Sequence, residues 1–198
     1  MNSINIKLLH NYCTGCNACA EVCPKRCISM QKDSAGFFYP ILNQSNCISC
    51  GLCSKVCPID NTTLLPPLKA FAARNVDAES QLKSSSGGIA YVLSLYVIRR
   101  GGVVYGCAFE GEEVRHIRVD SLVEAKSLQG SKYVQSNING IYESIKRDLA
   151  LGKEVLFIGT PCQCAGLKNF IAKDSPNLYI VDLVCHGVPS PKLFAKYI

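Results

Sequence analysis

The stretch CTGCNACAEVCP at residues 13–24 returns as CISCGLCSKVCP at residues 47–58. Each of its four cysteines has a partner 34 residues later, and a proline follows the fourth cysteine in both copies. The chain has 198 residues and 13 cysteines, so this repeat accounts for most of its thiols. The repeat predicts two related halves that share one chemistry.

The spacing of these cysteines indicates two cubane 4Fe-4S clusters. In the two-cluster pattern of bacterial ferredoxins, three closely spaced thiolates hold one cluster and the cysteine before proline ligates the other. The pattern assigns the ligands as follows: cluster one takes Cys13, Cys16, Cys19 and Cys57, and cluster two takes Cys47, Cys50, Cys53 and Cys23. Because each half completes the other's cluster, we expect neither half to fold well without iron.

Two other uses of cysteine fit less well. A disulfide framework needs an oxidising compartment, but the N-terminus carries no secretory signal pattern and the number of cysteines is odd. Structural zinc sites use paired Cys-x-x-Cys units, and two triplets each followed by Cys-Pro do not form such pairs. The iron-sulfur interpretation is therefore favoured.

Composition narrows the class of protein. The longest apolar run, residues 89–98, is too short to span a bilayer, so we expect a soluble, cytoplasmic protein without a membrane span. The net charge of +6 comes from scattered lysines and arginines rather than from a basic stripe with interleaved aromatic residues. That pattern predicts no nucleic-acid partner and indicates a solvated surface, with an acidic ligand or partner as the alternative.

The sequence predicts a mixed α+β and α/β protein with two domains. Residues 1–66 form the ferredoxin-like domain, with a hairpin between the cysteine runs and an extended linker at 62–67. Residues 67–198 form an α/β domain with a parallel β-α-β unit near its end. Because this part stops within a helix that follows a strand, we expect an incomplete domain.

Apolar patterns and turn residues place the elements of the second domain. Strands are expected at 103–109, 114–119, 154–159 and 178–184, with a further strand at 68–76. Helices are expected at 87–100, 138–149, 160–172 and 192–198, and Ser86 is the expected N-cap of the first. A further short helix is expected to begin at the capping-box pattern 121–124.

Three places in this domain are suited to a ligand. The small residues of Ser84-Ser85-Ser86-Gly87-Gly88 allow close backbone approach, although serine and glycine are also ordinary loop residues. The stretches Gly159-Thr160-Pro161-Cys162-Gln163 and Val184-Cys185-His186-Gly187 follow two parallel strands. Ligands of open α/β sheets bind beyond the carboxyl ends of such strands.

These stretches, together with Gln129-Gly130-Ser131-Lys132-Tyr133 and the two cysteine runs, resemble the coenzyme F420 hydrogenase/dehydrogenase beta-subunit family. The resemblance is to the version with an N-terminal two-cluster ferredoxin domain, and it covers nearly the whole chain. It implies an iron-sulfur flavoprotein that carries FAD. The residues it implies in flavin binding are Ser85, Ser86, Gly87, Gly88, Ser131, Lys132, Tyr133, Thr160, Pro161, Cys162 and Gln163.

The resemblance also implies a third 4Fe-4S cluster beside the flavin. Cys162 and Cys185 resemble two of its ligands, and the others would come from residues that this chain lacks. His186 is a candidate proton donor near the flavin, with a structural role as the alternative. The remaining thiols, Cys27, Cys107 and Cys164, are expected to pack as small apolar residues.

The leading hypothesis is an iron-sulfur flavoprotein oxidoreductase that passes electrons between ferredoxin-type clusters and an FAD-linked site for a small-molecule substrate. A redox partner protein, either a ferredoxin or an oxidoreductase subunit, would exchange electrons with it. One alternative is an electron-transfer module without flavin that docks on a partner enzyme. Another is a non-catalytic fragment in which the clusters are structural.

Overall fold

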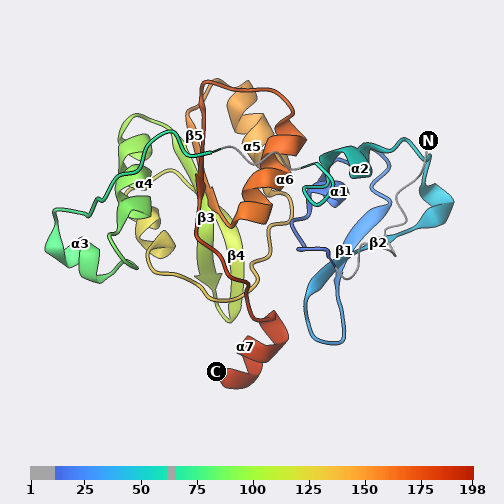
Figure 1. Ribbon diagram of the computed structural model, residues 1–198, viewed down its shortest axis with the longest axis horizontal. Helices are drawn as coiled ribbons and strands as arrows, with labels where there is room; N and C mark the ends of the chain where they lie inside the picture. The colour runs from blue at the N-terminus through green and yellow to red at the C-terminus, as the bar shows by residue number, and fades with distance from the viewer. Residues whose placement is uncertain (1–11, 62–65) are drawn as a thin grey trace.

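The computed structural model describes residues 12–61 and 66–198, which form two parts that lie side by side (Figure 1). The first part contains α1 (Ala18–Glu21), β1 (Ile28–Lys32), β2 (Phe38–Leu42), the short 3-10 helix η1 (Gln44–Asn46) and α2 (Leu52–Val56). The second contains α3 (Ala78–Leu82), α4 (Ile89–Arg99), β3 (Val103–Glu110), β4 (Glu113–Val119), the 3-10 helix η2 (Glu124–Leu128), α5 (Ile141–Ala150), β5 (Val155–Gly159), α6 (Pro161–Ile171), β6 (Leu178–Asp182) and α7 (Pro191–Tyr197). Within these ranges, every helix is too short or too polar to cross a lipid bilayer.

The second part is built on a mixed four-stranded sheet in the order β4-β3-β5-β6. The hairpin β3-β4 is antiparallel, whereas β3-β5 and β5-β6 are parallel. The helix α6 connects β5 to β6, which confirms the predicted β-α-β unit. The mixed α+β and α/β fold class is therefore confirmed.

Alternation along the central strands divides the apolar core into two layers. On β5, Val155 and Phe157 face α5 and α6, whereas Leu156 and Ile158 face α4. On β3, Tyr105 joins the α5 and α6 layer. Helices thus cover both faces of the sheet (Figure 1), which explains why β5 is buried along its whole length and reads as one apolar run.

Two expectations about local structure were wrong, and a third was confirmed. Residues 68–76 form neither helix nor strand, and their apolar side chains Leu68, Phe71 and Val76 are almost fully exposed. The helix α4 begins at Ile89 after a left-handed Gly88, so Ser86 is not its N-cap. The capping-box pattern at 121–124 does form and opens a short helix, as expected, and this helix is the 3-10 helix η2.

The proposed linker at 62–67 lies partly outside the described residues, because residues 62–65 are not described. Pro66 and Pro67 are exposed and belong to no helix or strand. The boundary between residues 66 and 67 therefore stays a prediction.

A buried polar cluster fixes α5 against β3 and β4. The Asp148 carboxylate accepts hydrogen bonds from the hydroxyl of Tyr105 (2.6 Å) and from Nε of Arg118 (2.8 Å), and it pairs with Nζ of Lys153 (3.1 Å). Burial raises the pKa of Asp148, but these donors outweigh burial and hold that pKa below its usual value. The cluster therefore stabilises the charged carboxylate inside the fold.

Replacing Asp148 with alanine is expected to destabilise the protein by about 3 kcal/mol, because the fully buried Tyr105 hydroxyl would lose its acceptor and Arg118 its main partner. Chemical unfolding followed by far-UV circular dichroism measures the change. Asp120→Ala is the matched control, since Asp120 pairs with the same Arg118 at the exposed surface and should cost less than about 1 kcal/mol. Equal losses in both variants would contradict this account.

Candidate iron-sulfur site

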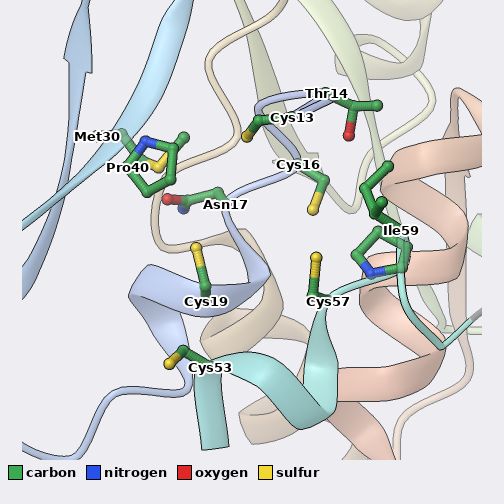
Figure 2. A pocket seen from close by; sticks show the side chains of 11 residues that line it. Cys13, Thr14, Cys16, Asn17, Cys19, Met30, Pro40, Cys53, Cys57 and Ile59 are labelled. Atoms are coloured by element: carbon green, nitrogen blue, oxygen red, sulfur yellow. The ribbon is translucent and has the colours of Figure 1, made fainter. Parts of the chain in front are cut away.

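Cluster one is assigned to a cavity between the cysteine loop 13–19, the hairpin β1-β2 and the end of α2. The four cysteines predicted for it, Cys13, Cys16, Cys19 and Cys57, all line this cavity. Figure 2 shows the sulfur atoms of Cys16 and Cys57 pointing toward one another, with Cys19 directed into the same space. Cys53 also borders this cavity, but its sulfur points away from the sulfur atoms of Cys16 and Cys57 (Figure 2). Cys57 of the second cysteine run therefore lies where it can complete the cluster held by the first run.

The thiols around this cavity resist losing their protons. Burial, together with charge repulsion from the neighbouring Cys162, Cys13 and Cys57, raises the pKa of Cys16 to about 12. Burial, with repulsion from other cysteines, also raises the pKa of Cys19. Four thiolates converging here need a positive charge at their centre, and the irons of a cluster supply it. The donor set therefore fits a cluster.

A second cavity adjoins the first and borders the open end of the hairpin. It is lined by the four cysteines predicted for cluster two, Cys23, Cys47, Cys50 and Cys53, and by Cys27. Cys50 is exposed, whereas the four cysteines of cluster one are buried or half-buried. Because Cys53 borders both cavities, the two sites share a wall.

Cys27 was expected to be a packing residue, and it is buried as expected. Its sulfur, however, lies only 3.3 Å from the sulfur of Cys23 and faces the second cavity. Its place outside the 34-residue repeat concealed this contact in the sequence. The second site thus has five thiols within reach.

The hairpin separates both cavities from solvent with paired apolar residues. Met30 and Pro40 are cross-strand partners and line the first cavity, whereas Ile28 and Leu42 are partners and line the second. The aromatic residues of the hairpin are not among the lining of the first cavity, and Phe38 borders a separate cleft of about 470 Å³ instead.

Long-range hydrogen bonds fasten the cysteine part to the sheet part. The Glu21 carboxylate of α1 accepts the backbone N–H groups of Gly140 (3.0 Å) and Glu143 (2.8 Å), and so caps the start of α5. The Asn169 amide of α6 donates to the carbonyls of Val56 (3.2 Å) and Asn61 (3.0 Å) beside α2. The position of cluster one relative to the sheet is thereby fixed.

Close packing reinforces this attachment. A Cβ atom at Gly166 of α6 would lie 3.2 Å from the Cys16 sulfur and 3.4 Å from Cβ of Ala18. The glycine therefore lets α6 lie directly against the loop of cluster one. Gln135 adds a bridge, since its amide oxygen accepts the N–H of Phe38 at 2.8 Å.

The Thr160 to Gln163 stretch forms the start of α6, close to cluster one. Gln163 completes a capping box with Thr160, and its amide also donates to Ser136. Cys162 is half-buried and close enough to Cys13 and Cys16 to raise the pKa of both by charge repulsion. This stretch, which the sequence predicted to bind flavin and a third cluster, therefore lies next to the first cavity.

The other predicted flavin stretches meet one another. The backbone N–H of Ser131 donates to Oγ of Ser85 at 2.8 Å. Lys132 is half-buried, and its ammonium group donates to the carbonyls of Ser127 and Gln129 in its own loop. Burial lowers the pKa of this lysine. Tyr133 is exposed.

Gly87 has a role that the sequence did not reveal. A Cβ at this position would lie 2.6 Å from the carbonyl oxygen of Ala73, and the carbonyl of Gly87 accepts the N–H of Asn75 at 2.7 Å. The absence of a side chain therefore permits the close approach of the 73–75 segment. That approach accounts for the glycine without a ligand.

Cys185 and His186 do not join the other candidates in the described structure. Both are exposed, and the contact of Cys185 is local, with the N–H of Gly187 at 3.4 Å. No described hydrogen bond or charge interaction links Cys185 to Cys162. Within residues 12–61 and 66–198, no three His, Cys, Asp or Glu side chains are placed to hold a single metal ion.

His116 is a buried residue that sequence reasoning missed. Its Nε2 lies 3.2 Å from the carbonyl oxygen of Ile158, which can only accept, so Nε2 carries the proton. Its Nδ1 then accepts from Oγ of Ser136 (3.0 Å), which in turn accepts from the Gln163 amide (3.0 Å). A neutral histidine thus supports the turn between β5 and α6.

Acidification is expected to destabilise the fold through His116. Burial lowers its pKa to about 4, whereas the unfolded chain titrates near 6.5. The unfolded state therefore binds more protons between these values, so stability is lost as the pH falls below 6.5. We expect a loss of about 2 kcal/mol between pH 6.5 and pH 5 in anaerobic unfolding titrations. His116→Gln should show a flatter dependence, and an unchanged slope would contradict the assignment.

Two family models match this chain. Residues 12–61 match the 4Fe-4S dicluster domain, and residues 152–198 match the model for the C terminus of the coenzyme F420 hydrogenase/dehydrogenase beta subunit. The resemblance inferred from the sequence is therefore confirmed in both parts of the chain. No curated protein matches the sequence.

Solved structures agree with the fold. A chain of the F420-reducing [NiFe] hydrogenase complex from Methanosarcina barkeri is similar, with a TM-score of 0.52 and 20% sequence identity. The alignment covers 62% of the present chain and 46% of that chain, so the present chain spans less than half of its length. At this identity the likeness shows a shared fold.

Proposed function

We propose that this chain, which carries a 4Fe-4S dicluster domain and a coenzyme F420 hydrogenase/dehydrogenase beta-subunit segment, belongs to an iron-sulfur flavoprotein oxidoreductase. In the proposal, electrons pass through the two clusters toward an FAD-linked site for a small-molecule substrate. The carrying observation is that two cysteine cavities share the wall at Cys53, and the loop of the first cavity lies against α6 at Gly166. A sequence of second cavity, first cavity and α6 suits a short path for electrons.

The eight cysteines of the repeat are the proposed ligands. Each cavity is lined by its expected set, with Cys57 at cluster one and Cys23 at cluster two. Apolar residues around the first cavity, among them Met30, Pro40 and Ile59, would limit the access of water. Burial and the number of hydrogen bonds to the sulfurs are the levers by which a protein sets a cluster potential.

Several features of the chain suit FAD. The helix α4 begins at Ile89, so the N–H groups of its first turn have no acceptor within the helix and are donors suited to a phosphate. Ser85, which precedes this helix, is hydrogen-bonded to Ser131, so two of the predicted flavin stretches meet there. When bound, FAD supplies the step between one-electron and two-electron chemistry. The proposed third cluster would use Cys162, which neighbours cluster one.

The runner-up function is an electron-transfer module without flavin. Two observations favour it: Gly87 packs against the 73–75 segment, and the Lys132 ammonium group is held by carbonyls of its own loop. Under this alternative the sheet part serves to dock the clusters on a partner enzyme. The likeness to a chain of a hydrogenase complex suits such an arrangement.

Anaerobic purification of the longest native form distinguishes the two. We expect about eight irons per chain or more, reversible bleaching on reduction, and FAD released by denaturation. Ser85→Trp should lower the flavin content while the iron of the two clusters remains. A fully iron-loaded sample without any flavin would exclude the flavoprotein and leave the electron-transfer module.

A further inference from the structure

The second cavity opens on a surface that the proposed function does not use. We call it the cluster-two face, made of Lys25, Ile48, Cys50, Leu52 and Lys55. Four of these residues line the second cavity together, namely Lys25, Ile48, Cys50 and Leu52. Lys55 follows Leu52 by three residues on α2, which places both on one side of that helix. The apolar side chain of Ile48 is 57% exposed beside the exposed Cys50.

This face is basic. The two segments that surround cluster two, residues 23–28 and 44–56, contain Lys25, Arg26 and Lys55 and no aspartate or glutamate. All three side chains are exposed, and none takes part in an ion pair among the described residues. Cluster two with its four thiolates carries a net negative charge, and these cations lie at the surface beside it, where they attract an acidic surface and raise the rate of its encounter.

Cluster one is less accessible than cluster two to a partner protein. Its cysteines are buried or half-buried, and α6 covers their loop through Gly166. The path from cluster one leads inward to α6, whereas the path from cluster two leads through Cys50 to the surface. An external carrier therefore reaches cluster two first.

The size of the apolar surface decides between a permanent subunit and a transient carrier. Permanent interfaces are large and hydrophobic, whereas redox encounters are small and depend on charge. On the cluster-two face, only Ile48 and Leu52 present apolar side chains, and Leu52 is just 37% exposed. A small apolar centre within a basic rim suits a brief encounter.

We propose that the cluster-two face is the landing site for a small, acidic iron-sulfur carrier protein. One electron leaves the reduced cluster of the carrier and enters oxidised cluster two, and no bond or proton changes place. The proposal rests on the proposed function, because it requires cluster two to be present and redox-active. To the proposed function it adds the surface at which electrons enter, and it selects a ferredoxin-type carrier rather than a permanent subunit as the partner.

The test uses the full-length, cluster-loaded protein and a purified acidic 4Fe-4S ferredoxin. Anaerobic stopped-flow mixing of the reduced ferredoxin with the oxidised protein gives a second-order rate constant. The double variant Lys25→Glu and Lys55→Glu should lower that constant by about tenfold or more at low ionic strength. The difference should largely disappear near 0.5 M salt, where screening is strong, at a Debye length of only about 4 Å.

A charge-matched variant controls for net charge. Arg99→Glu with Lys126→Glu changes the total charge equally, but these exposed residues lie on α4 and η2, far along the chain from the cysteine part. Its rate constant should stay within about twofold of the unmodified protein. Equal slowing in both double variants would overturn the proposed landing site.

Further outcomes separate this proposal from the proposed function. A neutral photoreductant should reduce the clusters of all variants alike. If the photoreductant reduces the clusters but the rate constant with ferredoxin is the same after charge reversal, the landing site is wrong and the electron-transfer function stands. If it cannot reduce them in any variant, both fail. A ferredoxin complex or a self-dimer that survives gel filtration at high salt would also overturn a transient encounter.

Discussion

Replacing Cys13 and Cys57 together with alanine is expected to remove one cluster and to leave the other in place. Both cysteines line the first cavity, so one site loses two ligands while the four cysteines of cluster two remain. Iron analysis should fall from about eight to about four atoms per chain, and the remaining cluster should keep its reduced-state electron paramagnetic resonance signal.

A second pair of substitutions distinguishes crossover from simple pairing. Cys47→Ala with Cys57→Ala removes one ligand from each proposed site, so both clusters should be lost or severely depleted. Without crossover the results would be exchanged, because Cys47 and Cys57 would then share a cluster. Cys107→Ala is the control, since this half-buried thiol lies on β3 outside both cavities. It should keep about eight irons.

Removing the iron is expected to unfold the cysteine part while the sheet part stays folded. Apart from cysteines and glycines, the buried apolar residues within 12–61 are Ala18, Ile28, Val56 and Pro58, which are too few for an independent core. The second part has Tyr105, Tyr142 and Phe157 fully buried between the sheet and its helices. The clusters therefore contribute most of the stability of the first part.

Hydrogen exchange measures this difference. After chelation under reducing conditions, amides of β1 and β2 should exchange at least about a hundredfold faster, which corresponds to about 3 kcal/mol of local stability. Amides of β3 and β5 should keep their protection. Incubation with the iron-saturated chelator is the control. Simultaneous loss of protection in both parts would contradict the proposed boundary between residues 66 and 67 and indicate one cooperative unit.

Features that depend on local spacing were predictable from the sequence. Ligation of a small cluster restricts the spacing of cysteines, and the structure places all eight around two cavities. Burial on both faces makes β5 a continuous apolar run, and Thr160-Pro161 has the geometry of a helix start. In each case, residues that are close in sequence carry the whole signal.

Features that depend on distant partners were not predictable. The bonds of Glu21 to the start of α5 span about 120 residues, and those of Asn169 to the α2 region span more than 100. The exposed apolar residues at 68–76 resembled a strand, but a strand also needs a free neighbouring edge, which sequence pattern does not report. His116 looked like one polar position in an alternating strand.

The bonds of Glu21 and Asn169 also set an order of events during synthesis on a ribosome. Residues 12–61 emerge before Gly140 and Asn169, which follow on the order of ten seconds later at usual elongation rates. Until then, the nascent cysteine loops lack the helices that hold them in place. We therefore expect iron-sulfur assembly factors to deliver stable clusters only after translation has passed α6, and premature loading to yield clusters that are easily lost.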